Sequence, residues 1–287
     1  MGGSYDALLR DTAVALTAAG IDNARFEARL LMAQAAGLSV EQLISRGRDP
    51  APTNVVETVR SLAARRVRRE PMAYILGERE FWGLPFKVTP AVLVPRPDSE
   101  TLIEAVLSLM PDRTRPWRIL DLGVGSGCLL LTLLREYPAA SGVGIDASAD
   151  ALAVAQENAE RLGVASRARL MVDDWRQQSW LEKLDGPFDL VVSNPPYIKS
   201  ATIAGLMPEV SRFEPKLALD GGTDGLDAYR LLAAGSRKLV TSGGYFVVEV
   251  GEGQALEVAD LFAAAGLSSR APWKDLGGIE RVVAAHH

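Results

Sequence analysis

The sequence predicts an α/β protein with a doubly wound parallel β-sheet, preceded by a small helical domain. From Thr114 to the end, short apolar runs of strand length alternate with segments of helical periodicity, as such a sheet requires. Before residue 85, by contrast, apolar residues recur at helical spacing only. The length of 287 residues agrees with two domains, because a domain averages ~150 residues.

Four stretches near the start have the apolar spacing of amphipathic helices: residues 5–19, 24–36, 40–45 and 54–69. Gly20, Gly37 and Gly47 are placed to end three of them. Ser39 precedes the third helix and Gln42 follows three residues later, which is a capping-box pattern. We interpret residues 1–85 as a helical domain that docks a macromolecular substrate.

The main basic cluster of the chain lies at the end of the fourth predicted helix. Its members are Arg60, Arg65, Arg66, Arg68 and Arg69. A solvated helix face explains such a run, and so does docking to an acidic protein surface or to RNA phosphates. The sequence leaves both interpretations open.

Residues 86–113 are expected to form a β-hairpin and linker, with a strand pair over residues 86–94. In the domain at 114–287, sheet strands are expected at residues 118–122, 142–146, 169–172, 188–193 and 244–250, and a hairpin-like pair at 275–283. Polar residues follow several of these strands. Doubly wound sheets bind ligands at the carboxyl ends of their strands, so we expect a site there.

A glycine-rich turn follows the first strand of the sheet. The turn consists of Gly123, Val124, Gly125, Ser126 and Gly127. Glycines let the backbone pass close to a ligand, although a purely structural strand-to-helix turn has the same composition. The spacing is G-x-G-x-G, whereas a dinucleotide fingerprint has G-x-G-x-x-G. A nicotinamide cofactor is therefore disfavoured.

The next two strands also end in polar residues. Asp146 comes a little over twenty residues after the glycine turn, where an acid can accept hydrogen bonds from both hydroxyls of a ribose. Its alternative role is the N-cap of a helix at residues 148–162. After the third strand, Asp173 or Asp174 can accept from an adenine amino group while Trp175 lies on its face, and we favour Asp174. Trp175 can equally be a packing residue.

The fourth strand ends in Asn194, Pro195, Pro196 and Tyr197. Two prolines fix φ near −65° and remove two backbone donors, so the carbonyl groups of this turn can face a ligand. The Asn194 side-chain oxygen and the Pro195 carbonyl together can accept both protons of a planar NH2 group, with Tyr197 as a flat wall. This arrangement suits N-methylation of an amide or of a base, and the turn alone does not choose between them.

Together these motifs resemble the PrmC/HemK family of class I methyltransferases, which methylate a glutamine side chain of peptide-chain release factors. The resemblance covers nearly the whole chain. Besides the glycine turn and the NPPY segment, it includes PMAYILG at 71–77, EFWGLPF at 80–86, VLVPRPDSE at 92–100, Glu214-Pro215, DGL at 224–226 and DLGGIER at 275–281. The family's segment after Pro-Arg is typically PETE, so Asp98 and Ser99 depart from it conservatively.

The resemblance implies a Rossmann-like sheet with an antiparallel last strand. It also implies S-adenosyl-L-methionine as the donor, S-adenosyl-L-homocysteine as the product, and the glutamine of a Gly-Gly-Gln motif in class I release factors as the acceptor. The donor-binding residues are then those of the glycine turn together with Asp146, Asp174, Trp175 and Asn194. The NPPY residues bind the acceptor and act in catalysis. We expect Arg96 and Glu100 to form a supporting ion pair, with direct substrate contact as the alternative.

Composition agrees with this hypothesis. The 31 basic and 36 acidic residues give a net charge of −5, whereas nucleic-acid binders usually carry a basic excess, so a protein partner fits better than stable nucleic-acid binding. Two rival hypotheses remain. One is a methyltransferase that acts on an amino group of DNA or RNA, or on a ribosomal-protein glutamine. The other is a non-catalytic binding protein with a methyltransferase fold.

Cysteine and histidine usage narrows the chemistry. Cys128 is the only cysteine, so no intrachain disulfide forms, and we expect a small core residue in a reducing cytoplasm. The only histidines are the last two residues, so we expect no metal site. The start lacks the pattern of a signal peptide, and no apolar run reaches the ~20 residues of a membrane span. We expect a cytoplasmic monomer.

Overall fold

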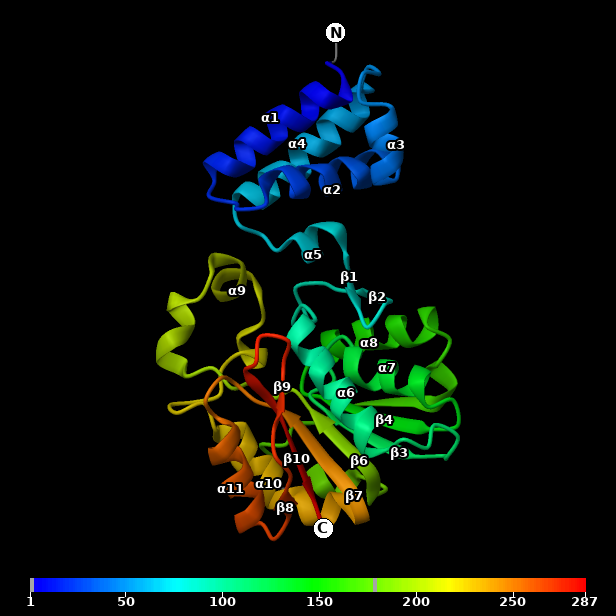
Figure 1. Cartoon of the computed structure of the whole chain (residues 1–287), viewed down its shortest axis with the longest axis vertical. Helices are drawn as coiled ribbons and strands as arrows, with labels where there is room; N and C mark the ends of the chain where they lie inside the picture. The colour runs from blue at the N-terminus through cyan, green and yellow to red at the C-terminus, as the bar shows by residue number, and fades with distance from the viewer. Residues whose placement is uncertain (1–2, 178–179) are drawn as a thin grey trace. The chain divides into compact units, whose positions relative to one another are not determined.

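The computed structural model describes residues 3–177 and 180–287 and divides the chain into two compact units (Figure 1). We call them the helical unit, Met1–Gly77 with Met207–Phe213, and the sheet unit, Glu78–Leu206 with Glu214–His287. The first boundary therefore falls at Gly77, where the sequence suggested residue 85. A second difference is that the helical unit also takes in a short segment from much later in the chain.

The helical unit is built from amphipathic helices that bury one face each. Leu16, Leu31 and Val59 are fully enclosed between them. Ser39 and Gln42 form the predicted capping box, and Gly37 ends the second helix in the left-handed conformation. The helices are α1 (Tyr5–Ala18), α2 (Ala24–Ala36), α3 (Val40–Ser45), α4 (Thr53–Val67), α5 (Met72–Leu76) and, from the later segment, α9 (Pro208–Phe213).

Arg66 is the buried centre of an ion-pair network in this unit. Only 7% of its side chain is exposed, and its guanidinium contacts Glu27 at 2.6 Å and Glu209 at 2.8 Å. Arg69 contacts the same Glu209 oxygen at 2.8 Å. Glu209 belongs to α9, so this network fixes the later segment to the end of α4. Burial lowers the pKa of Arg66, but its hydrogen bonds to both carboxylates give a net increase.

The solvated-face interpretation of the arginine cluster is therefore wrong for its inward members. Arg65 also pairs within the unit, with Glu70 at 2.5 Å. Arg60 and Arg68 are exposed. Sequence spacing placed all five on one helix but did not show that acidic partners come from α2 and α9, which are distant in sequence.

A β-hairpin opens the sheet unit, but not where the sequence suggested. Strands β1 (Glu78–Phe81) and β2 (Leu84–Lys87) pair antiparallel around Trp82 and Gly83. Both turn residues have positive φ, 55° and 68°, as a two-residue type I′ turn requires. The strand pair expected over residues 86–94 is therefore wrong. Tryptophan is a poor residue for this conformation, so the turn lacked the usual Asn-Gly signal.

The large sheet has the predicted doubly wound topology. Its strand order is β5-β4-β3-β6-β7-β10-β8, with β9 also on β10. The central pairs are parallel, and β10 is antiparallel to β7, which confirms the expected antiparallel last strand. The strands are β3 (Arg118–Leu122), β4 (Ser141–Asp146), β5 (Ala168–Val172), β6 (Phe188–Ser193), β7 (Val240–Glu249), β8 (Ser268–Ser269), β9 (Trp273–Lys274) and β10 (Glu280–His286).

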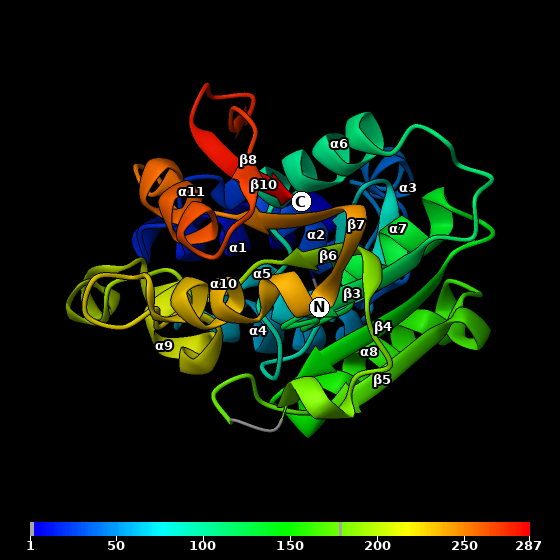
Figure 2. The same cartoon turned by 90° about the horizontal axis from the view of Figure 1, so that it is seen from below.

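Helices cover both faces of this sheet (Figure 2). One face packs against α6 (Glu100–Leu109), α7 (Cys128–Glu136) and α8 (Ala149–Arg161), and the other against α10 (Asp227–Leu239) and α11 (Ala255–Ala264). Neighbouring strand residues alternate between the two layers, with Ile119 in the first and Leu120 in the second. Short 3-10 turns lie at Pro97–Ser99, Ala165–Arg167, Trp180–Lys183, Ser200–Gly205 and Lys216–Ala218.

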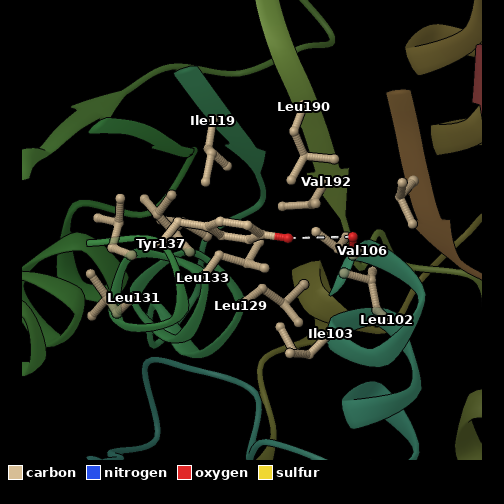
Figure 3. Packing of buried hydrophobic residues seen from close by; sticks show 14 of the residues in the cluster. Leu102, Ile103, Val106, Ile119, Leu129, Leu131, Leu133, Tyr137, Leu190 and Val192 are labelled. Atoms are coloured by element: carbon tan, nitrogen blue, oxygen red, sulfur yellow. Dashed lines mark hydrogen bonds between the residues drawn. The ribbon is translucent and has the colours of Figure 1, made fainter. Parts of the chain in front are cut away.

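The first layer holds a dry core around Tyr137 (Figure 3). Its ring lies among Ile119, Leu133 and Val192. Its hydroxyl donates to the backbone carbonyl of Met110, the residue that follows α6, at 2.8 Å. A buried hydroxyl needs such a partner, because an unpaired one costs about 1–3 kcal/mol. This core anchors β3, β6 and α7, the elements whose ends form the site.

Candidate active site

A cavity of about 540 Å³ opens at the carboxyl edge of β3, β4, β5 and β6. Its size lies within the range typical of small-molecule sites, ~300–1,000 Å³. Most of the sequence-predicted residues line it: Gly123, Val124, Gly125, Ser126, Asp146, Asp174, Trp175, Asn194, Pro196 and Arg96. Gly127, Pro195, Tyr197 and Glu100 are outside the lining. The edge that the strand pattern indicated is thus where the structure gathers the candidates.

The glycine turn adopts a conformation that only glycine adopts easily. Gly123 and Gly127 have φ of 80° and 83°. A Cβ on Gly127 would lie 2.7 Å from Leu131 Cδ1, and one on Gly123 would lie 3.0 Å from the Trp175 ring. The strand of Asp146 holds the turn, because the amides of Gly123 and Val124 donate to the Ile145 carbonyl at 2.8 and 2.9 Å. Gly127 is thus required for helix packing.

Asp146 is fixed by the backbone around it. Its Oδ2 accepts from the Gly125 amide and its Oδ1 from the Ser148 amide, both at 2.9 Å. Burial raises the pKa of Asp146, while these hydrogen bonds act to lower it. The N-cap of α8 is Ser148, whose hydroxyl accepts from Ala151, so the alternative N-cap role for Asp146 is wrong. An ionised carboxylate has about four acceptor sites, which leaves two for a ligand.

The two carboxylates after β5 have different partners. Asp173 has a side chain only 2% exposed and pairs with Lys183 at 3.0 Å. Asp174 pairs with Arg176 at 2.6 Å, and this hydrogen bond lowers the pKa of Asp174. Trp175 packs on the Gly123 backbone, so it is both a packing residue and part of the cavity wall.

The NPPY segment divides between the cavity and the interior. Asn194 and Pro196 line the cavity, whereas Pro195 is buried. Asn194 Nδ2 donates to Ser99 Oγ at 3.2 Å. Tyr197 packs into the second layer beside Gly251, and its hydroxyl donates to Glu249 Oε1 at 3.4 Å. Burial raises the pKa of Tyr197 well above its usual value.

The loop at residues 219–225 supports the backbone of this segment. Ile198 exchanges backbone hydrogen bonds with the loop, donating to Leu219 at 3.0 Å and accepting from Gly221 at 2.9 Å. A Cβ on Gly225 would lie 2.4 Å from the Tyr197 carbonyl, and Gln254 Nε2 donates to that carbonyl at 3.2 Å. The glycine-rich run at 221–225 is the signal for this close approach.

Arg96 and Glu100 do not pair as expected. Arg96 contacts Glu214 at 2.7 Å, and Glu100 accepts from the Trp82 amide at 2.8 Å. Glu214 has a side chain only 1% exposed, so burial raises its pKa against the opposing effect of Arg96. The expected pair does not form because Glu100 begins α6 and faces the hairpin turn. The carboxylate that Arg96 meets instead, Glu214, comes from the segment that follows α9.

Two further buried carboxylates were not singled out for chemistry in the sequence. Asp121 and Glu249 are each 1% exposed, and burial raises the pKa of each to about 7. Asp121 Oδ2 accepts from the Leu130 amide at 3.2 Å. Glu249 is the last residue of β7, so its position at the carboxyl edge of the sheet was the available signal.

The described part of the chain shows neither a membrane span nor a metal centre. Within residues 3–177 and 180–287, no helix is long and apolar enough to cross a membrane. The same residues contain no cluster of three His, Cys, Asp or Glu side chains that could hold a metal ion. Cys128 lines the cavity, and burial raises the pKa of its thiol to about 12, so it stays a neutral thiol.

Two family models and several curated proteins match the sequence of this chain. Residues 7–77 match the PrmC N-terminal domain and residues 98–208 the methyltransferase small domain. The release factor glutamine methyltransferase of Bradyrhizobium diazoefficiens is 45% identical over 99% of this chain and 95% of its own. That of Rhodospirillum rubrum is 46% identical over 94% of this chain and 81% of its own.

A solved structure shows the same fold at low sequence identity. A methyltransferase from Pyrococcus furiosus is 16% identical, with a TM-score of 0.51 over 71% of this chain and 89% of that one. The two curated relatives are thus similar to this chain over nearly its full length, at well above 30% identity. The structure adds the sheet order, the glycine turn at the end of β3 and the NPPY segment at the end of β6. The chain belongs to the release factor glutamine methyltransferase family.

Proposed function

We propose that the protein transfers a methyl group from S-adenosyl-L-methionine to the side-chain amide nitrogen of a glutamine in peptide-chain release factors. The glutamine we propose is that of the Gly-Gly-Gln motif in class I factors. One observation carries the proposal: a single cavity is lined by the glycine turn and Asp146 on one side and by Asn194 and Pro196 on another. Relatives with this activity in their names match nearly the whole chain, which supports the choice of acceptor.

The residues at the glycine turn fit the donor. The turn leaves open backbone beside Gly125, whose φ is 54°. Apart from Gly125 itself and its two chain neighbours, no heavy atom comes closer than 3.9 Å to the position of a Cβ there. We assign the ribose hydroxyls to the two free acceptor sites of Asp146. We assign the adenine to Asp174 and Trp175, which line the same cavity. When bound, S-adenosyl-L-methionine supplies an electrophilic methyl group on a sulfonium sulfur, and S-adenosyl-L-homocysteine is released.

Asn194 is placed to receive the acceptor. Its Nδ2 is occupied by Ser99, and no hydrogen bond between described residues occupies its Oδ1. The free oxygen can accept one proton of the substrate NH2 group. We assign the other proton to the Pro195 carbonyl, which is bonded to the cavity-lining Pro196 although the Pro195 ring itself is buried. A glutamine between two glycines presents little bulk, so its side chain can enter a narrow cavity. Pro196 then borders the path of that glutamine side chain into the cavity.

The chemical step needs alignment more than acid or base catalysis. An amide nitrogen is a weak nucleophile because its lone pair is delocalised, and in-line positioning supplies ~7–11 kcal/mol of a barrier. Hydrogen bonds from the NH2 group to Asn194 and Pro195 strengthen as positive charge develops on the nitrogen. The nitrogen bonds to the methyl carbon, the carbon–sulfur bond breaks, and the nitrogen gives its proton to water.

Several finer points belong to the same proposal. The protein acts as a cytoplasmic monomer, and the helical unit docks the protein substrate. The docking proposal rests on the compactness of that unit rather than on the arginine cluster, because Arg65, Arg66 and Arg69 already pair within it. Arg60 and Arg68 are the exposed arginines of the cluster that remain for such docking.

Methyl transfer from labelled donor tests the proposal directly. The protein is incubated separately with a release factor, its Gln→Ala variant in the Gly-Gly-Gln motif, a ribosomal protein and duplex DNA. Label is expected only on the unmutated factor, with mass spectrometry placing one methyl on that glutamine nitrogen. Label on the Gln→Ala variant would place the acceptor elsewhere in the factor. Faster transfer to the ribosomal protein or to DNA would replace the substrate class while keeping the methyltransferase chemistry.

A further inference from the structure

We propose that Gln254 is a positioning residue that joins two walls of the cavity at its acceptor end. One wall is the NPPY segment, and the other is the loop at residues 219–225. The proposal rests on the proposed function, in which Asn194 and the Pro195 carbonyl bind the substrate NH2 group. It adds a residue from outside the cavity lining that keeps these two acceptors in place.

The loop lies directly against the backbone of the NPPY segment. Asp220 and Gly222 of the loop line the same cavity as Pro196. A Cβ on Gly221 would lie 2.8 Å from the Pro196 carbonyl oxygen, so a side chain has no room between the two walls there. Ile198 fastens this end of the loop through two backbone hydrogen bonds.

The far end of the loop meets the segment through two carbonyl groups. A Cβ on Gly225 would lie 2.4 Å from the Tyr197 carbonyl oxygen, so the two backbones are in close contact. Both carbonyls are acceptors, and therefore neither can bond to the other. Gln254 Nε2 has two hydrogens and donates to both, at 3.2 Å to Tyr197 and 3.3 Å to Gly225.

The other atom of the same amide is held at the end of β7. Gln254 Oε1 accepts from the Gly251 amide at 3.0 Å, and Gly251 lies just beyond β7, which ends at Glu249. Gln254 is 8% exposed, so little water can take the place of its side chain. One amide thus joins the NPPY segment and the loop to the frame of the sheet, and we call this set of contacts the Gln254 junction.

The partners of Gln254 determine its orientation. All three are backbone groups: one amide that only donates and two carbonyls that only accept. The side chain therefore satisfies them in a single orientation. A methionine of similar length offers no donor, and an ionised carboxylate offers acceptors alone. Glutamine at this position is required by the junction.

The junction acts on the reacting groups through the two prolines. Because each proline fixes its φ, a shift of the Tyr197 carbonyl is passed along the backbone to the Pro195 carbonyl and to Asn194. A misplacement of ~1 Å costs up to ~10²-fold in rate. The glycine turn and Asp146, to which we assign the donor, belong to none of the joined segments. Loss of the junction should therefore slow transfer and leave donor affinity intact.

The experiment measures kcat and KM for methylation of the release factor at pH 6 and pH 8, and donor binding by calorimetry. The variants are Gln254→Met and Gln254→Glu. Each kcat is divided by the calorimetric number of donor sites per chain, so that misfolded protein does not count. Gln156→Met is the matched control, because it makes the same exchange at an exposed glutamine of α8 outside the cavity lining.

We expect Gln254→Met to lower kcat per donor site about 10- to 100-fold, with KM and donor affinity changed less than about threefold. Gln156→Met should keep the wild-type kcat. A residue that only stabilised the fold would lower the number of donor sites and leave kcat per site unchanged. Wild-type kcat per site in Gln254→Met, or a loss of donor affinity as large as the loss of kcat, would overturn the proposal.

Gln254→Glu tests whether the hydrogens of this side chain matter. Burial beside two carbonyl oxygens raises the pKa of the introduced carboxyl. Its protonated form can still accept from Gly251 and donate to one carbonyl, whereas its ionised form can donate to neither. Its kcat relative to wild type should thus be at least about fivefold higher at pH 6 than at pH 8. Titration of groups that both proteins share, such as Glu249, Glu252 and Tyr197, cancels in this ratio.

The same ratio at both pH values would show that donation to the carbonyls is irrelevant, which would also overturn the positioning role. If Gln254→Met does not fold, this ratio decides. Failure of the underlying function gives a different result, because the wild-type protein then does not methylate the glutamine. Transfer that is lost in Asn194→Ala but unchanged per donor site in Gln254→Met would keep the proposed function and remove the role of Gln254 alone.

Discussion

Buried charge at Arg66 of the helical unit is handled in the opposite way from that at Asp121 and Glu249 of the sheet unit. In the helical unit Arg66 lies between Glu27 and Glu209, with both carboxylates within 2.8 Å. In the sheet unit Asp121 and Glu249 are more deeply buried, yet between described residues neither makes an ion pair within 4 Å. One oxygen of each, Asp121 Oδ1 and Glu249 Oε2, is enclosed without a hydrogen-bond partner.

The difference separates structural charge from charge available for function. A buried ion pair with matched partners fixes segments that are distant in sequence, here α2, α4 and α9. Burial raises the pKa of a carboxylate that has no cation as a partner, and groups with such raised pKa values cluster at functional sites. Asp121 and Glu249 end or approach the ends of β3 and β7, at the edge where the cavity opens.

The largest effect is expected in the helical unit. Arg66→Ala removes the buried cation between the half-buried Glu27 and Glu209 and leaves Glu209 only Arg69, so it should lower the free energy of unfolding by about 3–5 kcal/mol. Arg60→Ala is the control, because Arg60 is exposed and such changes stay within about 0.5 kcal/mol. Urea unfolding of both variants measures the difference. Equal stability of the two would mean that the network contributes no more than a surface charge.

Asn194→Ala should produce the next largest effect, on catalysis rather than on stability. It removes an acceptor that acts as charge develops on the substrate nitrogen, so kcat should fall about 10²- to 10³-fold. Asn194 contacts the protein through Ser99 rather than through the donor-binding turn. Calorimetric donor affinity should therefore remain within about threefold of wild type. A matching loss of donor affinity would make Asn194 a structural residue of the turn.

Asp146→Ala should show the reverse pattern. Two charge-assisted hydrogen bonds to ribose hydroxyls contribute about 1.5–3 kcal/mol each, so loss of even one weakens donor binding about 10- to 100-fold. Asp150→Ala is a matched control, since Asp150 is a carboxylate lining the same cavity to which we assign no hydrogen bond with the donor. A similar loss in both variants would indicate a general charge effect, not a specific contact by Asp146.

The parts of this molecule that were predictable from sequence are those set by local pattern. The glycine turn, Asp146 and Asn194 each follow an apolar strand, and parallel topology brings strand ends together. Pairings between distant segments were not predictable. The partner of Arg96 is Glu214 rather than the nearby Glu100, because nothing local encodes which carboxylate the fold delivers.

The hairpin and the buried carboxylates were missed for related reasons. The turn at Trp82 and Gly83 depends on a positive φ at tryptophan, which local propensity disfavours. Glu249 looks in sequence like any polar residue that ends a strand. Its importance comes from burial and from contact with Tyr197, which only the packed structure defines. The same reasoning applies to Arg66, whose charge suggested exposure.

The smallest effect we predict tests the cost of a buried carboxylate without a cation. Burial raises the pKa of Asp121 from 3.8 to about 7, so the folded protein binds a proton more tightly than the unfolded chain does. Stability from this group is therefore present below pH 4 and lost as pH rises through about 7. Asp121→Asn cannot ionise, and its amide oxygen can still accept from the Leu130 amide.

The variant should consequently be more stable than wild type at pH 8, by roughly 1–3 kcal/mol, and the gain should be clearly smaller at pH 5. Urea unfolding without donor, at pH 5 and at pH 8, measures this. Asp150→Asn is the control, because that exposed carboxylate should leave the pH dependence as it is in the wild type. If Asp121→Asn destabilised the protein equally at both pH values, the carboxylate would be a satisfied structural group, and the contrast between the two units would hold only for Glu249.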